Sequence, residues 1–223
     1  YDDSVEFARI EADKNKWIVV SDTSWPGYFE PPRDVMLGYG VLTSEFNEKL
    51  TRAPTHIFLQ SACGGFAASV ASALRQYWGY QTPRVVIVES ELAPCLYESA
   101  KANEVKRVSI KEETIMAGLS CGEPSEMAWQ ILSEEASDFI TIPDNIVAPT
   151  VRVLTRPNGD DPLIAAGESA VAGLAVLICA AKQLDLKAKL GLDENSRVLL
   201  IGSEGVTDRE IFNTILEGGN NVG

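Results

Sequence analysis

The stretch FLQSACGGFAAS, from Phe58 to Ser69, joins an apolar run to a turn of very small residues and then to an alanine-rich segment. It predicts a strand, a small-residue loop and a helix that begins at Gly65. The first N–H groups of a helix lack intrahelical partners and carry the positive end of the helix dipole. Small residues let an anion come close to them, so the stretch is typical of a phosphate-binding loop. A glycine turn that only packs a helix on its strand has the same pattern, and both interpretations stand here.

Similar strands and helices alternate along the rest of the chain. The predicted strands cover residues 17–22, 55–60, 84–90, 139–144 and 197–205. The predicted helices cover residues 3–14, 34–50, 65–77, 95–102, 125–136, 168–184 and 207–216. Strands that are apolar on both faces and alternate with helices indicate an α/β fold, with a mostly parallel twisted sheet flanked by helices. The turn-rich stretch 24–34 suggests a boundary between subdomains.

Polar and small residues follow several of these strands directly. Asp22 ends the first predicted strand, the loop 61–65 follows the second, and Ser203 lies in the last. Ligands of open α/β sheets bind beyond the carboxyl ends of the strands, so we expect these three features at one edge of the sheet. The loop lacks both the GxxxxGK[ST] lysine and the GxGxxG spacing, which disfavours a nucleoside triphosphate or a dinucleotide as its ligand.

The composition narrows the class of partner. The 223 residues include 19 Lys and Arg against 32 Asp and Glu, a net charge of −13, and the longest basic run is Lys106-Arg107. We therefore expect no nucleic-acid partner. The sequence shows neither an apolar stretch of membrane-spanning length nor a signal-peptide pattern, which favours a cytoplasmic protein without a membrane partner.

The four cysteines and the single histidine, His56, do not form a metal-binding motif. The cysteines lie at positions 63, 95, 121 and 179 without a CxxC pair, so we expect no metal. Reduced thiols suit the predicted compartment, although a pairing of Cys95 with Cys121 across two loops remains open.

Five segments, in order, closely resemble the diaminopropionate ammonia-lyase family, pyridoxal phosphate (PLP) enzymes with the tryptophan-synthase-β fold. The segments are NKWIVVSDTSWPGYFEPPRDVMLGYGVL, THIFLQSACGGFAASVAS, AGLSCGEPSEMAWQIL, AAGESAVAGLAVL and VLLIGSEGVTD. The resemblance covers essentially the whole chain. It implies PLP fold type II, with residues 1–25 as the end of the small domain and 26–223 as the C-terminal part of the large PLP-binding domain.

The family places its cofactor-binding lysine in an N-terminal portion that is not recognisable here, so we expect the sheet to be incomplete and the isolated chain to be inactive. Lys14, Lys16 and Lys49 lie in polar contexts without the family's motif and are interpreted as surface charges. Sheet edges and apolar faces meant for missing strands would then be exposed, which favours association.

The resemblance also implies roles for individual residues. The residues expected to hold the PLP phosphate through backbone amides are Ser61, Ala62, Cys63, Gly64, Gly65 and Phe66. Ser203 is expected near the pyridine nitrogen, Asp22 as the group that takes the Cα proton, and Glu168 and Ser169 as lining of the substrate site. From the residues alone, Asp22 is interpreted as an N-cap or turn aspartate, Ser203 as a turn serine and Glu168-Ser169 as a helix start.

The implied reaction is α,β-elimination of 2,3-diaminopropionate to pyruvate and ammonia, in amino-acid catabolism, by a protein that is a homodimer when intact. Two alternatives stand beside it: an inactive remnant that acts as a binding or oligomerising module, and a PLP lyase for serine, threonine or another β-substituted amino acid. Three departures bear on this choice. Ala62-Cys63 replaces the usual Gly-Val, Ala170 a common glycine and Val206 a usual aspartate.

Overall fold

The sheet at the centre of the molecule is parallel throughout. The computed structural model describes residues 2–156 and 158–218. Its strands are β1 (His56–Gln60), β2 (Arg84–Ser90), β3 (Asp138–Ile142) and β4 (Val198–Leu200), which lie in the order β3-β2-β1-β4. All five positions of β1 are buried, as expected for a parallel strand covered on both faces. Ile57 of β1 lies opposite Val85 of β2 and Leu199 of β4.

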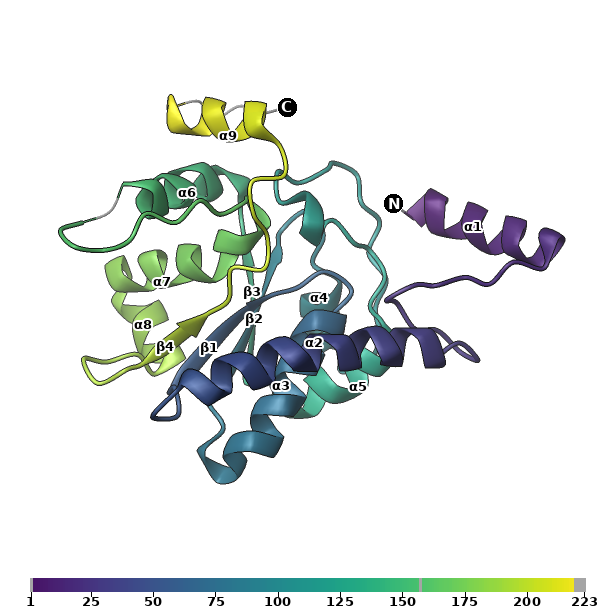
Figure 1. The fold of residues 1–223 in the computed structure, drawn as a ribbon, viewed down its shortest axis with the longest axis horizontal. Coiled ribbons are helices and arrows are strands. Elements are labelled where there is room, and N and C mark those ends of the chain that lie inside the picture. Colours follow the sequence, from purple (N-terminus) through teal and green to yellow (C-terminus); the bar gives the residue numbers. More distant parts are fainter. Residues whose placement is uncertain (1, 157, 219–223) are drawn as a thin grey trace.

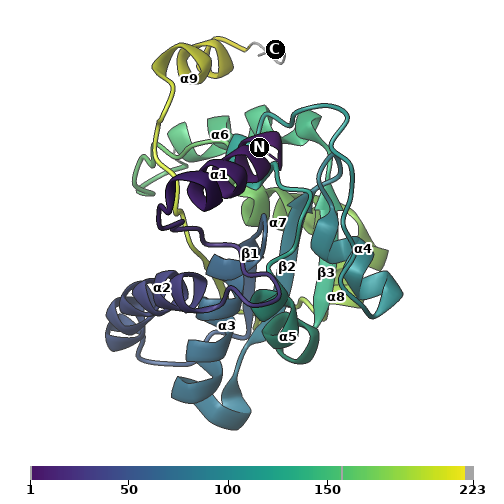
Figure 2. The same ribbon diagram turned by 90° about the vertical axis from the view of Figure 1, so that its right-hand side faces the viewer.

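Helices cover both faces of this sheet (Figures 1 and 2). The helices of the described residues, not all of which lie on the sheet, are α1 (Asp2–Asn15), α2 (Glu30–Lys49), α3 (Gly65–Trp78), α4 (Cys95–Ala102), α5 (Glu126–Glu135), α6 (Val147–Thr155), α7 (Ala172–Lys182), α8 (Leu184–Leu190) and α9 (Arg209–Leu216). Side chains alternate across a strand. Ile57 and Leu59 therefore pack with α3 and α5 in one apolar cluster, whereas Phe58 and Val86 pack with α6 and α7 in the other. The α/β fold class is confirmed, with three layers.

The segment 17–22 is not a strand, contrary to the sequence prediction. Trp17 and Ile18 are 65% and 88% exposed, and no strand in the described part of the chain pairs with this run. The segment is held instead by Tyr28, whose hydroxyl donates to the Val19 carbonyl oxygen at 2.8 Å and accepts from the Ser21 N–H at 3.0 Å. Apolar, β-branched sequence predicted a strand, but a strand needs a neighbour to pair with.

Several other boundaries differ from the prediction. The last strand is only three residues long, and 201–206 lacks regular structure. Helix α2 begins at Glu30 rather than Asp34, because Pro31 and Pro32 occupy its first turn, where proline's fixed φ suits a helix. The predicted helix 168–184 is a 3₁₀ turn, Ser169–Val171, followed by α7. Helices α6 and α8 were not predicted.

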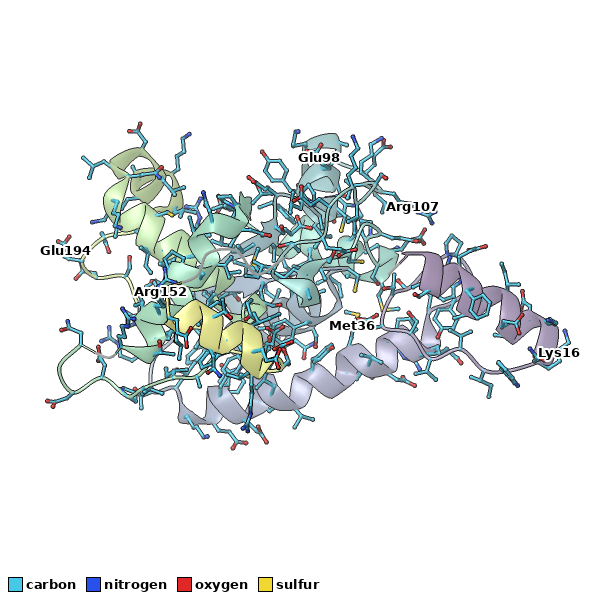
Figure 3. All side chains as sticks on the ribbon, turned by 90° about the horizontal axis from the view of Figure 1, so that it is seen from above. Lys16, Met36, Glu98, Arg107, Arg152 and Glu194 are labelled. Carbon is cyan, nitrogen blue, oxygen red and sulfur yellow. The ribbon has the colours of Figure 1, made fainter. Side chains whose placement is uncertain are left out.

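Helix α1 stands apart from the layers around the sheet, at the purple end of the chain in Figure 1. Helix α2, in contrast, packs against α3. The division into domains at residue 25 stays a prediction. Lys16 lies at the far end of the α1 segment, away from the sheet (Figure 3), and Lys14, Lys16 and Lys49 are all exposed, as expected of surface charges.

Candidate functional site

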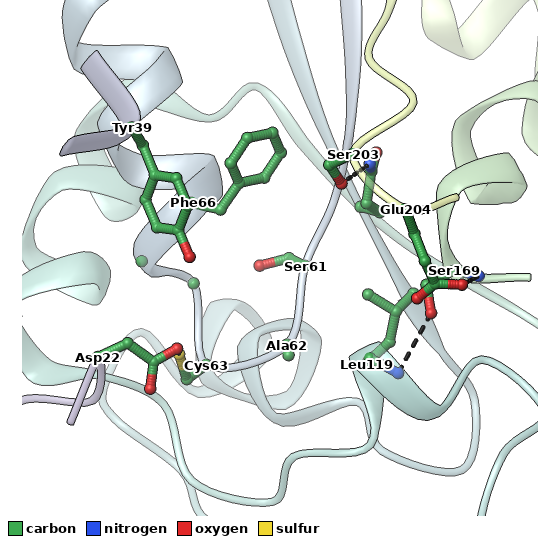
Figure 4. Close-up of a pocket in the computed structure, with 14 residues that line it drawn as sticks. Asp22, Tyr39, Ser61, Ala62, Cys63, Phe66, Leu119, Ser169, Ser203 and Glu204 are labelled. Atoms are coloured by element: carbon green, nitrogen blue, oxygen red, sulfur yellow. Dashed lines mark hydrogen bonds between the residues drawn. The ribbon is translucent and has the colours of Figure 1, made fainter. Parts of the chain in front are cut away.

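A pocket of about 280 Å³ lies beyond the carboxyl ends of β1 and β4 (Figure 4). From β1 the chain continues to β2 and β3 on one side of β1, whereas β4 pairs with β1 on its other side. The pocket therefore lies at the point where the strand order reverses. The lining residues are Asp22, Tyr39, Gln60, Ser61, Ala62, Cys63, Gly64, Gly65, Phe66, Gly118, Leu119, Ser169, Ser203 and Glu204. The fold thus brings together residues from six separate parts of the sequence.

The small-residue loop turns sharply into α3 at Gly64. Its φ is +103°, a left-handed value that glycine adopts most easily, and a Cβ there would lie 3.0 Å from the Ala128 Cβ. No side chain caps α3, and its first turn contains no acidic residue. The N-terminal end of α3, with its positive dipole end, therefore meets the edge of the pocket without an acidic side chain in its own first turn.

Ser61 carries a buried hydroxyl that has no hydrogen-bond partner within the protein. The residue is 3% exposed, and its Oγ points into the pocket in Figure 4. Its backbone is fixed, since the Ser61 N–H donates to the Val88 carbonyl oxygen at 2.9 Å. A buried polar atom without a partner costs about 1–3 kcal/mol, so this hydroxyl indicates that a ligand completes the site.

The loop is also held from the side opposite the pocket. The Cys95 thiol donates to the Ala62 carbonyl oxygen at 3.5 Å, and the Ser125 N–H donates to the Cys63 carbonyl oxygen at 2.8 Å. Ala62 is not among the residues with positive φ, so the exchange of glycine for alanine there needs no strained backbone. The possible disulfide between Cys95 and Cys121 is not present in the structure.

Ser203 follows β4 and is tied to the end of β1. The Gln60 side-chain Nε2 donates to Ser203 Oγ at 2.7 Å and to the Ile201 carbonyl oxygen at 2.7 Å. Gln60 is 4% exposed, so this link is well shielded from water. Because the Ser203 oxygen already accepts a hydrogen bond, its own hydrogen is available to donate to a ligand in the pocket.

Asp22 reaches the pocket from a segment anchored on α5. The Met127 N–H donates to Ser24 Oγ at 2.8 Å, and the Ser24 and Ser125 hydroxyls lie 2.8 Å apart. The adjacent Thr23 is 4% exposed and its hydroxyl donates to Asp22 Oδ1 at 3.3 Å. The carboxylate is thus positioned by an anchored turn rather than by the strand that the sequence predicted.

Tyr39 of α2 completes this side of the pocket. Its ring meets that of Phe66 edge to face, with centroids 5.4 Å apart. Burial, and then the negative charge of Asp22, raise the pKa of the Tyr39 hydroxyl above its ordinary value, so it stays protonated at neutral pH.

The opposite wall contains Ser169 and Glu204. The Ser169 N–H donates to Glu204 Oε1 at 3.1 Å, and the Gly118 N–H donates to Ser169 Oγ at 3.2 Å (Figure 4). The Gly167 N–H donates to the Glu204 carbonyl oxygen at 3.0 Å, which fixes this wall at a second point. Glu168 does not line the pocket. It is 8% exposed, and burial, followed by the charges of Glu204 and Asp208, raises its pKa.

The structure therefore gathers the predicted residues 61–66, Asp22, Ser203 and Ser169 around one pocket and leaves Glu168 outside its lining. Their roles stay predictions. Sequence reasoning missed the other five lining residues, Tyr39, Gln60, Gly118, Leu119 and Glu204. Glu204 lies inside the quoted segment VLLIGSEGVTD, and Gln60 is the last residue of β1. Their places in that segment and at a strand end were the signals that could have identified them. Tyr39 had none, because only packing brings α2 to the pocket.

The charged groups that line the pocket are two carboxylates, Asp22 and Glu204, and no lysine, arginine or histidine is among the described lining residues. Within residues 2–156 and 158–218, no cluster of three or more His, Cys, Asp or Glu side chains could hold a metal ion. None of the helices in the described part of the chain is long and apolar enough to cross a membrane.

Comparisons with known proteins agree on one family. A family model described as "Pyridoxal-phosphate dependent enzyme" matches residues 1–204. Diaminopropionate ammonia-lyase of Escherichia coli strain K12 is 37% identical over 222 residues, which is 97% of this chain and 56% of that protein. The chain thus spans little more than half the length of this curated relative.

Solved structures of the Escherichia coli enzyme superpose closely on this chain. One, in complex with an aminoacrylate-PLP azomethine reaction intermediate, gives a TM-score of 0.91 at 36% identity and covers 100% of this chain and 58% of that one. Another, in complex with D-serine, gives a TM-score of 0.92 at 36% identity, with coverage of 100% and 57%.

Proposed function

Because the chain belongs to the pyridoxal-phosphate-dependent enzyme family and is a homologue of diaminopropionate ammonia-lyase, we propose that the protein converts 2,3-diaminopropionate to pyruvate and ammonia by α,β-elimination. The observation that carries the proposal is the pocket itself. A buried, unpartnered Ser61 hydroxyl lies beside the uncapped start of α3, with Asp22 on one wall and Ser203 on the other.

The residues present fit PLP. Its phosphate is an anion that suits the backbone N–H groups of loop 61–66, and the Ser61 hydroxyl supplies a further donor. Its pyridine nitrogen suits Ser203, whose hydrogen is available because Gln60 donates to the oxygen. We assign cofactor binding to residues 61–66 and Ser203 on this basis.

When bound, PLP supplies an electron sink for the charge that develops at the substrate Cα. Asp22 takes the Cα proton, which requires the carboxylate form and a position within hydrogen-bond distance of that proton. The C–N bond to the protonated β-amino group then breaks, and the electron pair of that bond leaves with nitrogen, so that the ammonium departs as neutral ammonia. Water completes the conversion to pyruvate and releases the second amino group as ammonia.

Ser203 influences this chemistry through its neutrality. A hydroxyl donates to an unprotonated pyridine nitrogen, whereas a carboxylate would hold that nitrogen protonated. Less charge is then drawn into the ring, and prompt departure of the β leaving group is favoured. Ser169 and Glu204 form the wall beside it.

The charge of the pocket supports a diamino acid over a hydroxy amino acid. Two carboxylates, Asp22 and Glu204, line it, and 2,3-diaminopropionate carries one more amino group than serine does. No lysine lines the pocket among the described residues. The relatives are longer than this chain, and we assign the lysine that bonds the cofactor to a part of the protein that corresponds to their remaining length.

We further propose that the complete protein is a homodimer, and sedimentation equilibrium measures its oligomeric state.

The test is pyruvate release by the protein expressed from its complete reading frame and loaded with PLP. We expect release from 2,3-diaminopropionate, and a fall in kcat of about 10²–10⁴-fold in Asp22→Asn, because the general base is lost. Asp161→Asn, an exposed aspartate outside the pocket, should keep full activity.

The alternatives give different results in the same assay. Faster release from serine or threonine than from 2,3-diaminopropionate would identify a lyase of other β-substituted amino acids. PLP binding without release from any of these substrates would identify an inactive binding module. Full activity of Asp22→Asn would remove Asp22 from the mechanism.

A further inference from the structure

Cys63 lies against the carboxylate that we assign to proton abstraction. Its Sγ is 3.6 Å from Asp22 Oδ2, a normal length for a hydrogen bond from a sulfur donor, and the two side chains lie together on one wall of the pocket (Figure 4). The other carboxylate oxygen, Oδ1, accepts from the Thr23 hydroxyl. Each oxygen of Asp22 therefore has one neutral donor within the protein.

The thiol is held in the form that can donate. Cys63 is 6% exposed, and burial, followed by the charge of Asp22, raises its pKa to about 11. The N–H of Gly65 and the side chain of Thr23 lower the pKa of this thiol by less. At neutral pH the side chain is thus a protonated thiol, so it can neither attack a substrate nor repel Asp22 as a thiolate.

The remaining groups around Asp22 give it little electrostatic help. Tyr39 of α2 is a neutral phenol, and the other charged residue that lines the pocket is the carboxylate Glu204. None of the described residues that line the pocket is a cation. The hydrogen bonds from Cys63 and Thr23 are therefore the interactions that orient this carboxylate.

We infer that Cys63 is a positioning residue for the proton-abstracting group: its thiol donates to Asp22 Oδ2 and orients the carboxylate in the pocket. The inference rests on the proposed function of Asp22. A thiol is a weaker donor than a hydroxyl or a charged group. A strong donor stabilises an ionised carboxylate and makes it a poorer base, whereas a weak donor can orient the group at a smaller cost in basicity.

Two substitutions of Cys63 vary the strength of this hydrogen bond. Cys63→Ser introduces a stronger donor on a shorter side chain, which bonds to Asp22 only when the two groups move closer together. Cys63→Ala removes the donor. A hydrogen bond to the ionised form lowers the pKa of a carboxyl group. The pH at which kcat/KM falls on the acidic side should therefore be highest for Cys63→Ala, intermediate for the wild-type protein and lowest for Cys63→Ser. We expect steps of a few tenths to about one pH unit.

The titration of Asp22 can be followed without turnover. In the complete, PLP-loaded protein labelled with carbon-13 at aspartate carboxyl groups, the Asp22 resonance is identified by its loss in Asp22→Asn. Its midpoint should move in the same order, with Cys63→Ala highest and Cys63→Ser lowest. Thermal unfolding confirms that each variant is folded. The matched controls are Cys179→Ser and Cys179→Ala on α7, which lies on the other face of the sheet, and both should coincide with wild type.

The results separate the inference from the function on which it rests. Equal titration midpoints of Asp22 in wild type, Cys63→Ser and Cys63→Ala would overturn the inference. Equal midpoints are the result expected if Cys63 only fills space, because the strength of its donor would then have no effect on Asp22. Ordered midpoints with coincident activity profiles would also overturn it, since the hydrogen bond would then not act on the reaction. Absence of pyruvate release by the wild-type protein would instead contradict the proposed function, and the Asp22 midpoints alone would then show whether the thiol controls the carboxylate.

Discussion

Ser61 is the residue whose environment most clearly indicates a ligand. Its hydroxyl is buried, lacks a partner and faces the pocket. We expect Ser61→Ala to leave the free energy of unfolding of the cofactor-free protein unchanged, or to raise it by up to about 1 kcal/mol, because an unsatisfied polar atom is removed. The affinity for PLP should fall about tenfold, since a hydrogen bond to the phosphate is lost.

Urea unfolding without cofactor and a fluorescence titration with PLP measure these two effects separately. Ser72→Ala, on α3 and outside the pocket, is the control and should change neither quantity by more than a few tenths of a kcal/mol. Unchanged PLP affinity in Ser61→Ala would show that the hydroxyl does not bind the cofactor.

At this scale the sequence predicted residues that follow strands better than residues brought in by packing. The loop 61–65 and Ser203 follow from the rule that ligands bind beyond the carboxyl ends of parallel strands. Asp22 was found, but for the wrong local reason, since no strand carries it. Tyr39 could not be found, because its position depends on how α2 packs and no local pattern encodes that, whereas Gln60 had the signal of its place at the end of β1.

Helix α3 depends on the glycine that precedes it. Gly64→Ala would place a Cβ at a left-handed φ and 3.0 Å from the Ala128 Cβ, so we expect a loss of about 1–3 kcal/mol in the free energy of unfolding. Gly38→Ala, in the interior of α2 with open space around it, should instead raise stability by about 0.5–1 kcal/mol. Equal effects of the two substitutions in urea unfolding would refute this account of the loop.

The junction between β2 and α4 makes stability depend on pH. The Glu89 carboxylate, at the end of β2, accepts from the N–H groups of Leu96 and Tyr97 at 2.9 and 2.6 Å. Burial raises its pKa to about 8, from an ordinary value of 4.5, and these N–H groups lower it by less. The folded protein therefore binds this proton more tightly than the unfolded chain does.

The contribution of the Glu89 proton to stability is complete below about pH 4.5 and is lost as the pH rises through about 8. We expect Glu89→Gln, which cannot titrate, to lose less stability than wild type between about pH 5 and pH 9. Urea midpoints across this range measure the difference, and Glu91→Gln, an exposed glutamate nearby, should keep the wild-type dependence. Identical curves for wild type and Glu89→Gln would exclude the effect.

The elements themselves were predicted best where burial is continuous. Strands β1 and β2 and helices α3 and α4 match their predicted ranges within one residue, because apolar runs and small-residue turns determine them locally. The run 17–22 has the same apolar character but no neighbouring strand. Helix α6 was missed because Pro149 within it argues against a helix, although Pro149 lies in the first turn, where proline is tolerated.

Across the whole molecule, large apolar side chains remain exposed away from the pocket. Trp17, Ile18 and Val20 are 65%, 88% and 76% exposed, and Leu37 and Val41 of α2 are 67% and 61% exposed. We expect residues 1–223, expressed alone, to associate with increasing concentration, since exposed apolar patches favour contact between chains. Analytical ultracentrifugation across a concentration series measures this, and a monomer throughout the series would contradict it.

The central claim is that the head of α3 and the Ser203 hydroxyl bind the two ends of PLP, with Asp22 facing the substrate side. A crystal structure of the complete protein with PLP tests it most directly. We expect the phosphate against the amides of residues 61–66 and Ser61 Oγ, with the pyridine nitrogen beside Ser203 Oγ. Cofactor bound elsewhere, or a pocket at β1 and β4 that stays filled by side chains in the presence of PLP, would contradict it.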